Sequence, residues 1–450
     1  TGITISEVAL FQSGKLSIMK AGATVNPVND SGAEVIEGRD AMFRIYVTTD
    51  SGFQGRPISA RLKLNDGANG YSIKQTISGS STELSPANSF MIPVPAKVMS
   101  AGLNYSVELV ECGTGSGTDH SPRFPASGSA TIATRATGVI RLTLIPVTAS
   151  SITPNIEALA PKLKDYLESI YPVTSVEITK ASSPITGCAL SPAKAGDGTA
   201  WSDCLTLVRN RRIADKPAND VYYMGVVTPS ASYAGYCGSA CIAGVGYQST
   251  STTGSTMASA RAAISIGFDP VGLSSIAHEL GHNHGLLHSP GCGADSADTR
   301  FPHQTSGKAY IGWVGWDRRK PSGFIDPSKT KDMMSYCDPL WVSDYVYDQF
   351  ADRIAKLNGA AMLMGAQATA TWRVLDVIGN RTTWGPALTD PVPPAGEPES
   401  AVVYDQAGDV VAETTVYRTD IQDGSGAMYL VPEPEPNWAA LSIGSMLVEF

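Results

Sequence analysis

The sequence predicts a multidomain protein of mixed class, with a central α/β domain flanked by N- and C-terminal β-sandwich domains. At 450 residues the chain exceeds the size of one ordinary domain. Both ends contain short runs of strand character between turn residues, and the chain holds 44 glycines and 29 prolines. The middle alternates strand and helix patterns. We therefore expect domains at residues 1–136, 137–362 and 363–450.

The N-terminal region shows strand patterns without sustained helical periodicity. Residues 42–47, 60–64 and 105–110 carry apolar side chains at alternating positions, and Asn, Asp, Ser and Gly separate such runs. This pattern is typical of an immunoglobulin-like β-sandwich.

The central region begins with a predicted strand at residues 140–145 and a helical pattern at 159–170. A second helix is expected at 201–212 and a strand at 221–227. Strands that alternate with helices indicate an α/β sheet.

The last part of the chain returns to strand patterns. Ser343 is placed to cap a helix that we expect to stop at Asn358-Gly359. Strands are predicted at 371–375 and 402–404, and the proline-rich residues 391–398 are predicted to form a loop inside a β domain.

Composition excludes several classes of function. Apolar residues make up 42% and charged residues 17% of the chain, which is typical of a folded protein. The net charge of -9 argues against a nucleic-acid partner, because phosphate binding requires a basic face. No apolar run reaches the roughly 20 residues that span a bilayer, so we expect no membrane span.

The cysteines favour an oxidising compartment. Six of the seven lie between positions 188 and 337, at spacings that suggest local bridges. The pairing cannot be fixed from the sequence, and buried free thiols remain an alternative. We expect Cys112 to be unpaired, and the expected bridges are Cys188–Cys204, Cys237–Cys241 and Cys292–Cys337.

One segment carries the chemistry. In HELGHNHGLLH, His278 and His282 are four residues apart and share one face of a predicted helix, where both can bind one ion. Gly285 provides a turn that brings His288 round as a third ligand. Glu279 lies beside the first ligand, where a carboxylate can act as general base. This spacing predicts one catalytic zinc per chain, with a fourth position open for water.

Two other zinc sites fit less well. Enzymes of the thermolysin type use a glutamate as third ligand, but no glutamate lies between Glu279 and Glu397. A structural zinc site needs a fourth ligand, and no further Cys or His belongs to the cluster.

HELGHNHGLLH resembles the metzincin zinc motif. The later segment Asp332-Met333-Met334-Ser335-Tyr336-Cys337 resembles the metzincin Met-turn. The resemblance implies that Met334 lies beneath the metal, and that Tyr336 ligates zinc or stabilises the oxyanion. It also implies that Cys292 and Cys337 pass beneath the zinc.

The amino-acid sequence of residues 334–345 is similar to that of secreted bacterial metzincins that cleave O-glycosylated proteins. Ser289 departs from both the astacin and the adamalysin patterns, so the substrate rules of neither family transfer. In metzincins the peptide pairs with an edge strand above the metal. By position in the chain, Gly244, Val245 and Gly246 are the candidates for that rim. Trp341 is a candidate wall of a side-chain pocket, with plain packing as the alternative.

The function expected from these residues is a secreted, monomeric zinc endopeptidase with Glu279 as base, acting on proteins or glycoproteins such as mucins. The alternative is an adhesin or carbohydrate-binding protein built on an inert metzincin scaffold. The presence of Glu279 favours the enzyme, because a binding domain needs no base beside an open zinc.

Overall fold

The computed structural model describes residues 2–111, 122–238, 240–248, 258–320, 322–363 and 368–450. It divides into two compact units. The first comprises Thr1–Gly138, Leu167–Ser175 and His288–Asp352, and the second comprises Val139–Tyr166, Val176–Leu287 and Arg353–Phe450. Each unit thus combines segments that are far apart in the sequence. Cys112, expected to be unpaired, lies outside the described residues.

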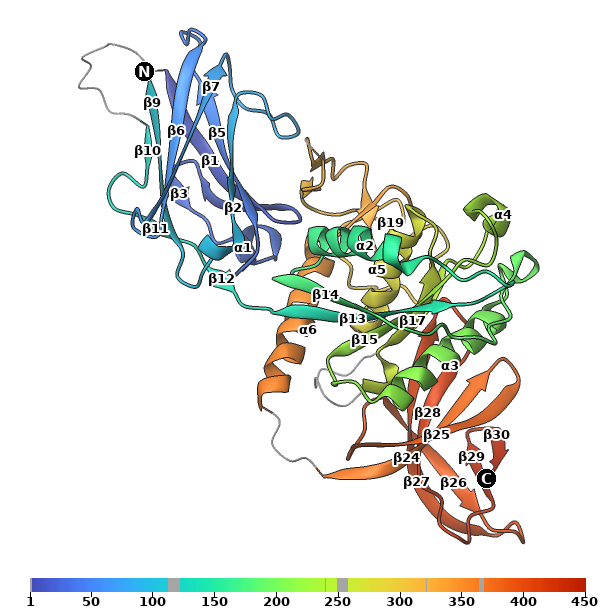
Figure 1. The fold of residues 1–450 in the computed structure, drawn as a ribbon. Helices are drawn as coiled ribbons and strands as arrows, with labels where there is room; N and C mark the ends of the chain where they lie inside the picture. The colour runs from blue at the N-terminus through green and yellow to red at the C-terminus, as the bar shows by residue number, and fades with distance from the viewer. Residues whose placement is uncertain (1, 112–121, 239, 249–257, 321, 364–367) are drawn as a thin grey trace. The chain divides into compact units, whose positions relative to one another are not determined.

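The N-terminal part of the first unit consists of two antiparallel sheets (Figure 1). Tyr105 of one sheet donates a hydrogen bond from its hydroxyl to the backbone oxygen of Ile18 in the other, at 3.2 Å. One sheet has the order β3-β2-β1-β5-β8, with β3 at Ala23–Thr24, β2 at Lys15–Lys20, β1 at Ile3–Phe11, β5 at Ala41–Thr49 and β8 at Ser89–Val94. The other contains β10 (Arg123–Phe124), β9 (Asn104–Glu111), β6 (Arg56–Leu64) and β7 (Asn69–Ile77), and β11 (Ala130–Thr131) pairs with β9.

Alternation explains why these segments form sheets. In β6 the side chains of Ile58, Ala60, Leu62 and Leu64 are buried, whereas the residues between them are more exposed. This period of two gives each sheet one apolar face. The smaller elements of this region are α1 (Pro27–Ser31), β4 (Val35–Ile36), the 3-10 turn η1 (Ala96–Val98) and β12 (Thr134–Arg135).

Residues 288–352 of the first unit have little regular structure. They form two-residue strands that pair as β18 (Gln304–Thr305) with β19 (Lys308–Ala309), β20 (Gly315–Trp316) with β21 (Phe324–Ile325), and β22 (Lys331–Asp332) with β23 (Leu340–Trp341). Trp316 packs on Phe11 of β1, and the two ring centroids are 5.8 Å apart. The long segment after the third histidine is therefore held by the N-terminal sheet rather than by strands of its own.

The second unit is built on a mixed sheet. Strands β13 (Val139–Val147), β15 (Val221–Val227) and β17 (Ala262–Ile266) are parallel neighbours, as Figure 1 shows. β14 (Ser175–Lys180) flanks β13, and β16 (Gly244–Tyr247) pairs antiparallel with β17. The helices of this region are α2 (Ile156–Ile170), α3 (Gly198–Asp215), α4 (Tyr233–Cys237) and α5 (Val271–Asn283), with 3-10 turns η2 (Pro192–Lys194) and η3 (Ala258–Ala260).

Helices α3 and α5 pack on opposite faces of this sheet, as the pleat of β17 shows. Ile264 of β17 belongs to the same buried cluster as Leu205 of α3. Its neighbour Ser265 points the other way and contacts Ser275 of α5, with 2.8 Å between the two hydroxyl oxygens. The central α/β pattern expected from the sequence is therefore present.

The C-terminal strands are hydrogen-bonded to this sheet through its strand β16. β27 (Val410–Gln422) pairs antiparallel with β16, with Gly246 opposite Gln422 and Tyr247 opposite Ile421. The continuation runs β27-β26-β29-β30, with β26 at Glu397–Tyr404, β29 at Ala440–Ile443 and β30 at Met446–Glu449. β24 (Thr369–Ile378) pairs with β25 (Arg381–Pro391) and with β28 (Ala427–Pro432). An unpaired strand edge accepts any strand of suitable register, and strand patterns in a sequence do not say which edge they join.

Two expected boundaries also change. Helix α6 begins at Asp344, where Ser343 accepts a hydrogen bond on its hydroxyl from the Val346 amide at 3.0 Å, as the capping pattern predicts. It does not stop at Asn358-Gly359 but continues to Leu363. The Asn358 side-chain amide donates to the Ile354 carbonyl, one turn earlier in the same helix, at 2.9 Å. The proline-rich loop is shorter than 391–398, since β26 already starts at Glu397.

Three disulfides are formed, Cys188–Cys204, Cys237–Cys241 and Cys292–Cys337, the same pairs that the spacings suggested. Disulfides persist in oxidising compartments, so they indicate such an environment. Within the described ranges, every helix is too short or too polar to cross a membrane.

Candidate metal centre

Helix α5 presents the first two histidines from a fully enclosed position. Leu273, Ile276 and Leu280 are buried, and the polar residues of the helix are also covered. The Asn283 side-chain amide fixes the helix end to the sheet, because it donates to the backbone oxygens of Tyr247 at 2.8 Å and Ala262 at 3.0 Å. The helix is thus held rigidly over β16 and β17.

Three histidines and one carboxylate converge at a single point. The ligand atoms of His278, His282, His288 and Asp423 all lie within 4.8 Å of one another. The Nε2 atoms of His278 and His282 are 3.1 Å apart. Gly285 follows the helix with a φ of 90°, a left-handed conformation that favours glycine, and so allows the turn before His288. The structure brings the three predicted ligands together.

The ring orientations fit a metal ion. Nδ1 of His282 lies 2.9 Å from the Leu286 carbonyl oxygen, and Nδ1 of His288 lies 2.7 Å from the Asp295 carbonyl oxygen. A carbonyl only accepts hydrogen bonds, so both Nδ1 atoms carry the proton and each Nε2 presents a lone pair. Imidazole nitrogens with a carboxylate oxygen suit zinc and also other divalent first-row ions.

Glu279 lies beside this cluster with its carboxylate out of solvent. The residue is 2% exposed, and its Oε2 has no hydrogen-bond partner among the described residues. Burial raises the pKa of Glu279 well above its usual range, and the charge of Asp423 raises it further. A carboxyl group with a raised pKa and a free oxygen is suited to accept and return a proton.

Two glycines of β16 make room for Glu279. A Cβ atom on Gly244 would lie 2.5 Å from Oε1 of Glu279, and one on Gly246 would lie 3.3 Å from Oε2. These glycines were expected to line a substrate rim. The structure places them directly against the expected base, while Val245 between them is buried on the other face of the strand.

The predicted Met-turn is organised by a buried aspartate. Met334 is fully buried, and its amide donates to Oδ1 of Asp332 at 2.8 Å. The same carboxylate accepts hydrogen bonds from the Ser289 hydroxyl at 2.6 Å and the Ser343 amide at 2.9 Å. Asp332 therefore connects the residue after the third histidine to the turn and to the start of α6.

Tyr336 lies beside the third histidine. Its hydroxyl is 3.3 Å from Nε2 of His288, and the residue is 44% exposed. Tyr336 is therefore a partly exposed residue that contacts the third histidine.

Two other residues have packing roles in the structure. Trp341, the candidate pocket wall, is 3% exposed and donates from Nε1 to the Ser13 backbone oxygen at 2.8 Å, so it packs against the N-terminal sheet. His284, which the motif excludes as a ligand, is buried and stacks on Tyr222 at 4.8 Å between ring centroids. Burial lowers the pKa of His284 to about 3.

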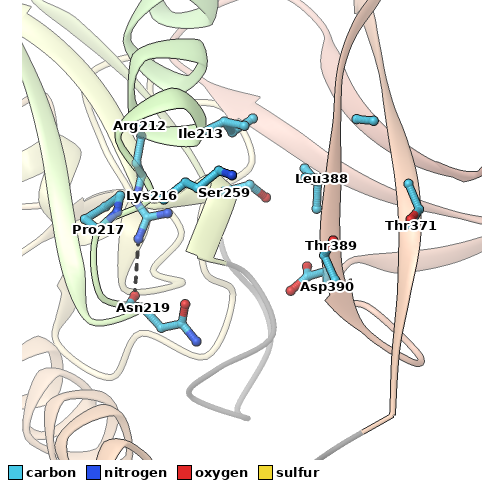
Figure 2. Close-up of a pocket in the computed structure, with 11 residues that line it drawn as sticks. Arg212, Ile213, Lys216, Pro217, Asn219, Ser259, Thr371, Leu388, Thr389 and Asp390 are labelled. Carbon is cyan, nitrogen blue, oxygen red and sulfur yellow. Dashed lines mark hydrogen bonds between the residues drawn. The ribbon is translucent and has the colours of Figure 1, made fainter.

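A separate cavity of about 430 Å³ lies within the second unit, and none of its lining residues belongs to the metal cluster (Figure 2). Figure 2 shows Arg212 from α3 on one side and Asp390 from β25 on the other. Arg212 donates to the Val221 carbonyl at 3.1 Å. Burial raises the pKa of Asp390 to about 7. No motif in the sequence predicted this cavity.

Two comparisons with known proteins were negative. No family model matches the chain, and a search of curated proteins finds no match. The assignment therefore depends on the residues themselves.

Sequence reasoning missed Asp423 and the role of Asp332. Asp332 had a signal, since it is the first residue of the segment that resembles the Met-turn. Asp423 had none, because it lies in the C-terminal strands, far from the histidines, with no ligand spacing around it.

Proposed function

We propose that this chain is a zinc-dependent endopeptidase of the metzincin type. The observation that carries the proposal is the convergence of His278, His282 and His288 beside the buried carboxylate of Glu279. Three histidines hold one ion per chain, and a bound zinc would supply Lewis-acid activation of water and of a peptide carbonyl.

The chain's own residues would carry the proton and position the substrate. Glu279 takes a proton from water at its unpartnered Oε2 and returns it to the leaving amine. The hydroxyl of Tyr336, which lies beside His288 on a partly exposed residue, donates to the carbonyl oxygen as negative charge develops on it. Met334 keeps its predicted structural role in the buried turn.

The substrate we propose is a protein or glycoprotein, and the protein would act as a secreted monomer. Its three disulfides support an oxidising, extracellular environment. The likeness to bacterial metzincins that cleave O-glycosylated proteins supports the glycoprotein class. The buried position of Trp341 removes it from the proposed substrate contacts, whereas the β16 backbone beside Glu279 stays among them.

One observation favours a different function. Asp423 gives the cluster a fourth protein ligand, which the sequence had seemed to lack, and four protein ligands are typical of a structural zinc site. An inert binding or adhesion protein on this scaffold is therefore the second candidate. Glu279 argues against an inert protein, because a buried carboxylate oxygen without a hydrogen-bond partner lowers stability and persists where it has a function.

A zinc and hydrolysis assay on two variants tests the proposal. Purified protein should contain about one zinc per chain, and His282→Ala should remove it. Glu279→Gln should keep zinc and fold but lower hydrolysis of an unstructured protein substrate by roughly 10²–10⁴-fold, because the base is gone. Glu435→Gln, at an exposed position, is the matched control and should change neither. Zinc content that survives His282→Ala, or full turnover in Glu279→Gln, contradicts the proposal.

A further inference from the structure

Asp423 reaches the histidines from the loop that joins β27 to β28. Its Oδ2 lies 3.3 Å from Nε2 of His278 and 3.3 Å from Nε2 of His282, and its side chain is 9% exposed. The carboxylate therefore faces both ligand nitrogens of α5 at nearly equal distance.

This contact has the geometry of a shared cation site, because one ligand atom from each of the three histidines and Asp423 lies within 4.8 Å of the others. Nδ1 of His282 donates to the Leu286 carbonyl, so the neutral ring presents a lone pair at Nε2. A lone pair and a carboxylate oxygen repel each other at 3.3 Å. An ion bound by both atoms turns the repulsion into attraction, so the geometry fits Asp423 as a ligand of the same ion.

Contacts on both sides of Asp423 fix the loop and direct the Asp423 carboxylate toward the histidines. Asp423 has a φ of 63°, a left-handed conformation that is uncommon outside glycine. The residue before it is anchored, since the side-chain amide of Gln422 donates to Oε1 of Gln248 at 2.9 Å. On the other side, the Ser425 amide donates to the Ser202 hydroxyl of α3 at 2.9 Å. A strained backbone conformation persists only where the surrounding contacts maintain it. Here the contacts of Gln422 and Ser425 maintain the conformation that places Asp423 at the histidines.

The same segment covers the strand beside Glu279. Gly246 and Tyr247 of β16 pair with Gln422 and Ile421 of β27. Gly244 and Gly246 adjoin the Glu279 carboxylate, so this is the backbone along which a peptide would have to align. β27 therefore occupies part of the strand edge next to the expected base, and Asp423 lies where it would bind an ion held by the histidines.

We propose that Asp423 is the fourth ligand of the metal and that it holds the centre largely closed, so that the chain is partly latent and hydrolyses substrate slowly until this loop withdraws. The inference rests on the proposed peptidase function. It assigns regulation to the chain's own C-terminal strands: a peptide gains access to the ion and to Glu279 only when the Asp423 carboxylate leaves.

The test compares Asp423→Ala with Asp420→Ala in the full chain. Asp420 lies on β27 shortly before this loop, but its side chain is 47% exposed and pairs with Arg418, so it is the matched control. Three readouts are taken: the rate at which a chelator removes zinc, the affinity for acetohydroxamate measured by calorimetry on the zinc-loaded protein, and hydrolysis of an unstructured protein.

Loss of a ligand should speed zinc removal by at least about tenfold, since even outer-sphere substitutions weaken metal binding by about 10–100-fold. Acetohydroxamate, which needs an open position on zinc, should bind Asp423→Ala at least about tenfold more tightly than the unaltered chain, and hydrolysis should rise. Asp420→Ala should behave as the unaltered chain does.

The outcomes separate the two proposals. Equal zinc removal and equal acetohydroxamate affinity in Asp423→Ala and the unaltered chain overturn the role of Asp423, whatever the activity. Faster zinc removal and tighter acetohydroxamate binding without any hydrolysis support the ligand but refute the peptidase, and with it the latency. An unaltered chain that hydrolyses as fast as Asp423→Ala refutes the latency and leaves the peptidase standing.

Discussion

The position of the Glu279 carboxylate depends on the absence of a side chain at Gly244 of β16. The carboxylate lies against β16 where Gly244 has no side chain, and a Cβ there would come within 2.5 Å of Oε1. In a packed interior the carboxylate can move only by displacing other atoms. The strand therefore sets the place of the expected base as much as helix α5 does.

We expect Gly244→Ala to lower turnover sharply while zinc content is retained, because the three atoms nearest to the new methyl group all belong to the Glu279 side chain. A displaced base loses part of the roughly 10²–10⁴-fold that general-base catalysis provides. Gly70→Ala, on a strand where an added Cβ meets no atom within 4 Å, is the control. Steady-state kinetics and metal analysis check the result, and unchanged turnover in Gly244→Ala would show that Glu279 tolerates displacement.

Tyr336→Phe removes the hydroxyl that lies 3.3 Å from Nε2 of His288. If this hydroxyl donates to the developing oxyanion, kcat should fall by about 10²-fold or more, while KM changes little. Tyr233→Phe, at a tyrosine with 36% exposure on α4, should leave both unchanged. A rise in KM with constant kcat would instead make Tyr336 a residue that only binds substrate.

The histidines could be predicted from the sequence because helix geometry relates His278 to His282, and one turn at Gly285 relates both to His288. Asp423 could not. Its approach depends on which strand edge the C-terminal segment joins, and that pairing is a long-range choice without a local pattern.

At the level of secondary-structure elements, α3 is joined to the C-terminal strands by a buried ion pair. Arg209 of α3 pairs with Asp376 of β24 through both carboxylate oxygens, with 2.8 Å from Nη2 to Oδ2, and the Arg209 side chain is fully buried. Arg209 also donates to the Tyr247 hydroxyl of β16 at 3.2 Å. One guanidinium therefore connects a helix with two strands of the sheet.

We expect Asp376→Asn to lower the free energy of unfolding by roughly 3–5 kcal/mol, because it leaves the buried Arg209 charge without its counter-ion. Asp203→Asn provides a close comparison, since Asp203 also lies on α3 and pairs with Arg381 of β25, but its side chain is 48% exposed. That exposed pair should contribute less than about 1 kcal/mol. Urea unfolding measures both, and equal effects of the two substitutions would contradict the role given to Arg209.

Element prediction succeeded where one short pattern settles the structure. The strand at residues 221–227 and the cap at Ser343 are present as expected, because alternation and capping act over a few residues. The predicted end of α6 at Asn358-Gly359 was wrong. Asn358 also donates to the Val139 carbonyl at 3.2 Å, so a contact with a distant strand helps to hold the helix through its expected stop.

Across the whole molecule, the sequence predicts the class of each region but not how the regions are joined. The α/β centre and the C-terminal strands share one sheet through β16 and β27, and they also share a core. Trp201 and Leu205 of α3 belong to the same buried cluster as Trp372 and Met428 of the C-terminal strands. Burial of apolar surface contributes about 25 cal/mol per Å², so the α/β part depends on these strands for its stability.

The shared core leads to a prediction about truncation. A chain that ends at Leu363 loses the partners of Trp201, the strand that covers β16 and the counter-ion of Arg209. It should therefore fail to unfold cooperatively and should not retain zinc, although a sequence-based boundary near residue 363 would make it a complete domain. A chain that ends at Asn437 keeps β24–β28 and loses only β29 and β30, which lie at the end of the sheet order. This control should unfold cooperatively at a lower temperature and keep its metal. Circular dichroism during heating, with metal analysis, checks both chains, and a cooperative, zinc-bound chain ending at Leu363 would show that the C-terminal strands are dispensable.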